Sequence, residues 1–167
     1  FLNQNDCRPT DLEPIVQFGQ YDGHSLQYSG AIWFPMVYDL PPHVKEGLGE
    51  RKRANGLDRA RRYAEAVGAR WVLPNSGPPA FLDDDLFALN MIDGDELSIF
   101  PDQTEFLARL AAVGRNGIMN IPGTTIDIGP DSIEVTHPVA DVGAIFADKR
   151  SYLTQYQADW KPWLDDL

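Results

Sequence analysis

The chain begins with Phe1-Leu2-Asn3-Gln4-Asn5-Asp6-Cys7-Arg8-Pro9. Its apolar beginning favours a short strand, and the turn-forming residues that follow end that strand. Asp6 would then lie at the carboxyl end of the strand, where a carboxylate can bind a hard or borderline cation. The alternative is that Asp6 only caps the chain reversal by bonding to its own backbone. Position 6 is therefore predicted to be a metal ligand or a turn cap.

Beyond this strand, the clearest element is a helix over about residues 43–67. Its apolar residues recur at helical spacing on one face, and Gly68 follows as a C-terminal stop. Three glycines weaken its first half, at about 1 kcal/mol each relative to alanine. These are the apolar residues Leu57, Ala60, Ala64 and Val67, and the glycines Gly47, Gly49 and Gly56.

Further elements alternate between strands and helices, which predicts an α/β protein. Asp102 and Glu105 form a capping-box pattern at the start of a second helix. The turn Gly129-Pro130-Asp131 joins the two strands of a predicted hairpin. The predicted strands cover about residues 25–28, 71–73, 117–121, 125–128 and 132–135, and the helices about residues 11–18, 102–113 and 142–167.

Composition limits the classes of function. The chain has 167 residues, enough for one domain, and its single cysteine, Cys7, excludes an internal disulfide and a multi-cysteine metal site. A reducing cytoplasm is the expected location. The net charge of −11 argues against nucleic acid or an anionic membrane as the main partner. No apolar run is long enough to span a membrane.

Two places have polar residues suited to binding a small molecule. The turn Asn75-Ser76-Gly77-Pro78-Pro79 could present the Ser76 side chain and backbone N–H groups to an anionic substrate. The alternative is a rigid connection that leaves a strand. His24 follows Asp22-Gly23 in an expected loop and could reach the edge of the site, although an ordinary surface or packed histidine is the alternative. Asn75, Ser76, Gly77 and His24 are the predicted substrate-binding residues.

Several phrases resemble one known family. Phe1-Leu2-Asn3-Gln4-Asn5-Asp6-Cys7 resembles the strand-to-loop motif of metallo-β-lactamase-fold proteins in the CMP-N-acetylneuraminate hydroxylase-like group. Further similar phrases cover much of residues 1–137. They are Tyr28-Ser29-Gly30-Ala31-Ile32-Trp33-Phe34-Pro35, taken as the next strand of that group, Ala69-Arg70-Trp71-Val72-Leu73-Pro74, Ser76-Gly77-Pro78-Pro79-Ala80-Phe81-Leu82 and Ile99-Phe100-Pro101-Asp102-Gln103.

The resemblance implies the second half of an αββα sandwich over residues 1–137, with a helical extension or linker over residues 138–167. In that family Asp6 matches an aspartate that bridges two metals, so zinc or iron is expected in the full-length parent. The family's His-x-His-x-Asp-His motif is absent, and no histidine stands near Asn75-Ser76. No metal-dependent catalysis is therefore expected from this chain alone.

Three functions follow from the resemblance. The first is a fragment of a metal-dependent hydrolase that acts on an ester, lactone or phosphodiester. The second is an iron-dependent oxygenase that uses a Rieske-type electron donor. The third is a binding or scaffold module that has lost its metal site. The expected partners are the missing N-terminal half of the fold or a second copy of the chain, together with a small-molecule substrate.

Overall fold

The computed structural model describes residues 1–30, 32–91 and 98–166, and within them the chain is a mixed α/β protein. Three parallel strands form one small sheet in the order β1-β2-β3, which is also their order along the chain. The strands are β1 (Leu2–Gln4), β2 (Gly23–Gln27) and β3 (Trp71–Asn75), and the helices between them are α1 (Glu13–Phe18) and α2 (Pro42–Val67). Because all three strands run in one direction, their carboxyl ends meet at one edge of the sheet.

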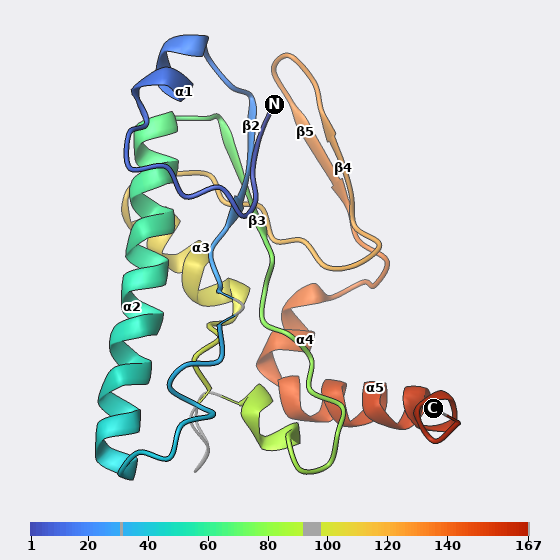
Figure 1. Cartoon of the computed structure of the whole chain (residues 1–167). Coiled ribbons are helices and arrows are strands. Elements are labelled where there is room, and N and C mark those ends of the chain that lie inside the picture. The colour runs from blue at the N-terminus through green and yellow to red at the C-terminus, as the bar shows by residue number, and fades with distance from the viewer. Residues whose placement is uncertain (31, 92–97, 167) are drawn as a thin grey trace.

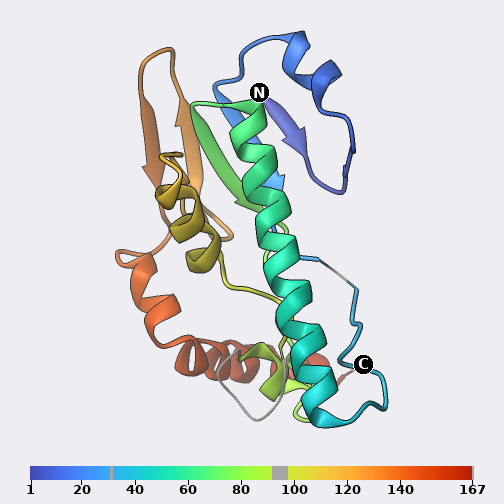
Figure 2. The same ribbon diagram turned by 90° about the vertical axis from the view of Figure 1, so that its left-hand side faces the viewer.

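The long helix α2 covers one face of this sheet and continues past its edge (Figures 1 and 2). The predicted apolar stripe is buried, with Leu57 and Ala64 fully excluded from solvent. The helix is continuous through its glycines and ends at Gly68, whose left-handed φ of 66° is the conformation expected of a C-terminal stop. The sequence prediction for α2 is confirmed to within one residue at its N-terminal end.

Helix α3 (Gln103–Ala112) packs beside α2 and completes the core. Phe106 and Leu110 of α3 are fully buried, and together with Leu26, Val72 and Leu57 they form the main apolar cluster. The Phe106 ring stacks on the Tyr28 ring with centroids 5.3 Å apart. The core therefore lies between α2, α3 and the strands β2 and β3.

A separate antiparallel hairpin extends beside the sheet (Figure 1). It consists of β4 (Thr125–Ile128) and β5 (Ile133–Thr136), paired over four residues each, which confirms the predicted hairpin. The predicted strand over residues 117–121 is replaced by a single bridge between Val72 and Gly117. A Cβ at Gly117 would lie only 2.5 Å from the Leu107 side chain, so the chain crosses α3 too closely to accommodate a larger residue.

The C-terminal region folds as two helices, α4 (Val142–Ala147) and α5 (Lys149–Leu164), where the sequence predicted one. Helix α5 contacts earlier parts of the chain: Lys149 Nζ lies 2.6 Å from the Asp102 carboxylate, and Gln157 Nε2 donates to the Leu82 carbonyl over 2.7 Å. Leu153 is buried. The division into residues 1–137 and 138–167 stays a prediction, but the helices are docked on the body of the chain.

The structure differs from the sequence predictions in the segment after β2, at the start of α1 and at the cap of α3. The resemblance implied a strand over residues 28–35, but residues 28–30, 32 and 33 belong to no strand and residues 34–37 form a turn; residue 31 lies outside the described residues. A short 3₁₀ helix, η1 (Phe87–Asn90), follows further along the chain. Helix α1 starts at Glu13, two residues later than the predicted helix over residues 11–18. Asp102 does stand at the cap position of α3, but its carboxylate makes no cap hydrogen bond and pairs with Lys149. A nearby ammonium group attracts that carboxylate more strongly than a backbone N–H does.

Candidate functional site

The carboxyl ends of β1 and β3 are joined by side-chain hydrogen bonds. Ser76 Oγ donates to Asn5 Oδ1 over 2.5 Å, which joins the chain after β3 to the chain after β1. Asn75 Nδ2 donates to Ser25 Oγ of the intervening strand over 3.1 Å. In open parallel sheets, ligands bind in the crevice outside this edge. The residues predicted from the turn at position 75 therefore lie where such a site is expected.

Two residues at this edge have a backbone conformation that is unusual for a side-chain-bearing residue. Asp6 has a φ of 58° and Ser76 a φ of 51°, both in the left-handed region. Aspartate tolerates this region better than most residues, whereas serine rarely adopts it. Such positions cost about 1–3 kcal/mol and cluster at binding and active sites. The hydrogen bond from Ser76 to Asn5 stabilises the strained backbone conformation of Ser76.

A cavity of about 560 Å³ opens beside the end of β3. Asn75, Ser76 and Gly77 form one wall, and Tyr152 and Tyr156 of α5 line the opposite part. Most of its remaining lining is apolar, with Pro74, Ala80, Ile121, Pro122, Ile145, Phe146 and Leu153 contributing. A concave, largely apolar cavity with a few polar groups is the usual form of a small-molecule site.

Tyr28 supplies a buried hydroxyl group to the cavity. The residue is 1% exposed, and its hydroxyl has no hydrogen-bond partner in the described structure. Burial, together with the nearby Asp102 carboxylate, raises the pKa of Tyr28 well above its ordinary value, so the hydroxyl stays protonated and can donate. A Cβ at Gly77 would lie 2.9 Å from this hydroxyl, so glycine keeps the space beside it open.

The positive and negative charges in the cavity neutralise each other. The Lys149 ammonium and the Asp102 carboxylate form an ion pair at 2.6 Å, with most of each side chain buried. Asn120 is held beside them, since its backbone N–H donates to Gln103 Oε1 and its Nδ2 donates to the Pro74 carbonyl. With the charges paired, the cavity suits an uncharged polar ligand better than an anion.

His24 does not join this site. It lies within β2 and not in the loop that the sequence predicted, and its side chain is fully buried beneath the sheet. Its Nε2 is 2.9 Å from Gln4 Oε1. Burial lowers the pKa of His24 to about 4, so the ring is neutral at physiological pH. The loop was predicted because His24 follows the turn-forming pair Asp22-Gly23, but pairing with β1 and β3 overrides that local preference.

Asp6 lies in the turn after β1, as predicted, and its side chain is exposed. Among residues 1–30, 32–91 and 98–166, no group of three or more histidine, cysteine, aspartate or glutamate side chains is arranged to hold a metal. Cys7 is free and exposed. His137 bonds through Nδ1 to Thr124 Oγ1 at 3.0 Å, far along the chain at the hairpin.

Sequence reasoning missed Tyr28, Asn120 and Lys149 as parts of this site. Tyr28 follows β2 directly, so its position at a strand's carboxyl end was the available signal. Lys149 meets Asp102 across 47 positions of sequence, and no local pattern predicts such a pairing. In the part of the chain that the structure describes, no helix is both long and apolar enough to cross a membrane.

Comparison with known proteins finds relatives along almost the whole chain. A protein of Mycolicibacterium smegmatis is 48% identical over 167 residues, and proteins of two Mycobacterium tuberculosis strains, CDC 1551 and H37Rv, are 46% identical over 169 residues. All three are provisionally named Rieske 2Fe-2S iron–sulfur proteins. The matches cover 98% of this chain and 32–33% of the relatives. No family model matches the chain, and no solved structure does.

These relatives correct the family that the sequence suggested. The metallo-β-lactamase resemblance, and the hydrolase that it implied, are wrong, because relatives at 46–48% identity carry the iron–sulfur name. The resemblance rested on short phrases rich in turn formers and strand aromatics, which recur wherever local backbone geometry demands them. The oxygenase function, the scaffold function and the missing half-sandwich as a partner were inferred from the same resemblance, so they are no longer supported. The sheets of three and two strands do not confirm a half-sandwich.

The chain is thus similar, over nearly all of its length, to about a third of each of these iron–sulfur proteins.

Proposed function

We propose that this chain is a cluster-free part of a Rieske-type electron-transfer protein, and that it binds an uncharged small molecule in the cavity beside β3. The observation that carries the binding role is the buried, unpartnered Tyr28 hydroxyl in that cavity. Two strained residues, Asp6 and Ser76, lie at the same sheet edge. The relatives' names support the electron-transfer role.

The residues of this chain do not fit a Rieske cluster. Such a cluster is held by two cysteines on one iron and two histidines on the other. The sequence contains one cysteine, Cys7, and three histidines. His24 is buried against Gln4, and His137 bonds to Thr124. We therefore propose that the cluster belongs to a part of the longer protein outside residues 1–167, as the names and lengths of the relatives favour.

The cluster assignment predicts that Cys7→Ser leaves the iron and acid-labile sulfide content of the full-length protein unchanged. Cys7 is exposed and has no second cysteine in this chain to complete a ligand pair. The measurement is iron and sulfide per polypeptide, together with the visible absorption spectrum. A variant that loses its iron would contradict the assignment and make Cys7 a ligand.

The cavity can bind a ring with few polar atoms. Tyr28 offers one donor, and the side-chain carbonyl of Asn120 offers an acceptor that no described hydrogen bond uses. A sugar ring would bury four or five hydroxyl groups, and each one left unpaired costs about 1–3 kcal/mol. An uncharged planar ring with an amide-like edge needs only these two partners. Such a ligand is the small-molecule substrate or effector that we propose for this site.

Binding of 2-pyridone, an uncharged ring with an amide edge, tests the cavity. Tyr28→Phe removes only the donor, and we expect its affinity to fall about threefold to tenfold, the worth of one neutral hydrogen bond. The control is Tyr38→Phe, the same change at a residue that is 53% exposed and outside the cavity. Saturation-transfer NMR titrations on the full-length protein give the affinities. Equal binding by the two variants, or none by the wild type, would refute the site.

The metal role of Asp6 stays a prediction within this proposal. Its carboxylate would need at least two further ligands from residues outside those that the structure describes. Asp6→Asn should then lower the metal content of the full-length protein, measured by elemental analysis, and unchanged content would exclude the role. A cytoplasmic location is likewise kept as part of the proposal.

A further inference from the structure

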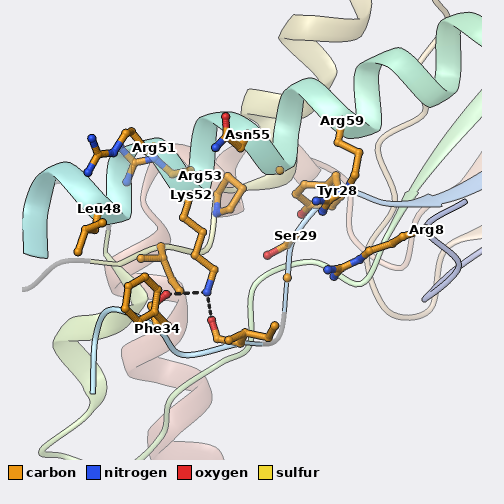
Figure 3. Close-up of a pocket in the computed structure, with 15 residues that line it drawn as sticks. Arg8, Tyr28, Ser29, Phe34, Leu48, Arg51, Lys52, Arg53, Asn55 and Arg59 are labelled. Atoms are coloured by element: carbon orange, nitrogen blue, oxygen red, sulfur yellow. Dashed lines mark hydrogen bonds between the residues drawn. The ribbon is translucent and has the colours of Figure 1, made fainter. Parts of the chain in front are cut away.

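A second hollow, of about 380 Å³, lies between α2 and the chain that follows β2, and it is basic although the protein is acidic (Figure 3). Five basic residues line it, among them Arg8 from the chain after β1 and Lys52 and Arg59 from α2; the other two are Arg51 and Arg53. Figure 3 shows Arg8 and Lys52 on either side of Ser29, with the Lys52 ammonium group directed at the Phe34 carbonyl. These cations are gathered in one place in a chain whose net charge is −11.

These cations have no acidic partners in the described structure. The ion pairs formed by residues 1–30, 32–91 and 98–166 involve other basic residues, and none includes Arg8, Lys52 or Arg59. Among the described residues, the partners of Lys52 Nζ are main-chain carbonyls, those of Ile32 and of Phe34, the latter over 2.6 Å. Carbonyl groups leave its positive charge uncompensated.

Burial and the positive charge of Arg8 lower the pKa values of the two neighbouring cations. Burial, and then the neighbouring Arg8 charge, lower the pKa of Lys52. The pKa of Arg59 is lowered by the same two causes, burial first and Arg8 second. Placing like charges together is unfavourable unless an anion binds between them. A bound anion would therefore remove the electrostatic cost of holding these cations close together.

A buried hydroxyl lies in the same hollow. Ser29 is 2% exposed, and its Oγ has no hydrogen-bond partner among the described residues. Leaving a buried hydroxyl unpaired costs about 1–3 kcal/mol. Because Ser29 lines the hollow with the three cations, a ligand oxygen there can accept its hydrogen bond.

From these contacts we infer that the hollow binds a phosphorylated small molecule, with the phosphate group held by Arg8, Arg59, Lys52 and the Ser29 hydroxyl. Three cations match the charge of a phosphate dianion better than that of a single carboxylate, and guanidinium groups bind phosphate through paired hydrogen bonds. Ile32, Phe34 and Leu48 give the hollow an apolar wall for the carbon part of the ligand. The acidic net charge disfavours a nucleic-acid backbone as the source of the phosphate.

Phenyl phosphate, which joins a phosphate to a small apolar ring, is the probe. Isothermal titration of the full-length protein at low salt should show binding, and raising the salt should weaken it. Inorganic phosphate, benzoate and phenol are the comparison ligands, and each should bind at least about fivefold more weakly. Equal affinity for inorganic phosphate would contradict the apolar wall, and equal affinity for benzoate would contradict the phosphate.

Two variants separate the site from general charge effects. Arg59→Gln should weaken phenyl phosphate binding by roughly tenfold or more, the usual loss for one charge-assisted contact. The control Arg150→Gln makes the same charge change at an exposed position on α5, outside the hollow, and should leave binding within about twofold. Equal losses in both variants would overturn the site.

Ser29→Ala distinguishes a binding role from a structural one. Removing an unpaired buried hydroxyl should leave the melting temperature of the free protein unchanged or raise it, while the affinity for phenyl phosphate falls about threefold to tenfold. An affinity equal to that of the wild type would show that Ser29 does not touch the ligand. Absence of phenyl phosphate binding by the wild type would refute the whole inference.

Discussion

Phe106→Ala is expected to lower the free energy of unfolding by about 3–5 kcal/mol, the largest effect of any single substitution considered in this chain. Phe106 is fully buried in the cluster beneath the candidate site, and its ring stacks on Tyr28. Alanine would leave a cavity that the surrounding sheet and helices cannot fill. Urea unfolding followed by far-ultraviolet circular dichroism gives the change directly.

The control is Phe18→Ala, since Phe18 is 86% exposed at the end of α1. That change should alter the free energy of unfolding by no more than about 0.5 kcal/mol. A comparable loss in both variants would mean that the core described between α2, α3 and the sheet is not the core of the protein. Phe106→Ala should also weaken ligand binding at Tyr28, because the stacked ring fixes the position of the hydroxyl.

The second large effect is a loss of stability in acid that depends on His24. Burial lowers the pKa of this residue to about 4 in the folded protein, against an ordinary value of 6.5. Between these two pH values the unfolded chain binds a proton at residue 24 and the folded chain does not. Its contribution to stability is therefore complete above pH 6.5 and falls as the pH drops toward 4, by about 3 kcal/mol in total.

The measurement is the free energy of unfolding at pH 7 and at pH 4.5, for the wild type and for His24→Gln. Contributions from other titrating groups are common to both proteins and cancel in the difference. The wild type should lose about 2–3 kcal/mol more than the variant between the two pH values. Parallel losses would show that His24 is accessible to protons in the folded state, contrary to its burial against Gln4.

Sequence patterns predicted the elements whose periodicity is strong. Helix α2 was predicted because Leu57, Ala60 and Ala64 repeat at helical spacing, and β4 and β5 because a turn separates two alternating runs. Strand β2 was misplaced by two residues at its start, since Gly23 and His24 carry little strand preference. Its residues pair with β1 residues 22 positions earlier and with β3 residues 48 positions later, and local patterns do not contain such pairings.

The site was predicted in part for the same reason. Asn75, Ser76 and Gly77 were identified because a turn after a strand exposes polar groups, and the structure places them along one cavity. Tyr28 and Lys149 reach that cavity through the packing of α3 and α5, so their role depends on tertiary contacts. The basic hollow was missed because its arginines and lysine follow the ordinary pattern of a solvated helix face, and only the fold shows that Arg8 joins them.

Iron and acid-labile sulfide analysis decides whether the cluster of the proposed iron–sulfur protein is held outside this chain. The analysis compares the purified full-length protein with residues 1–167 expressed alone. We predict the visible spectrum and the iron and sulfide of a 2Fe–2S cluster in the full-length protein, and neither in residues 1–167. A cluster retained by residues 1–167, or absent from the full-length protein, would contradict the account.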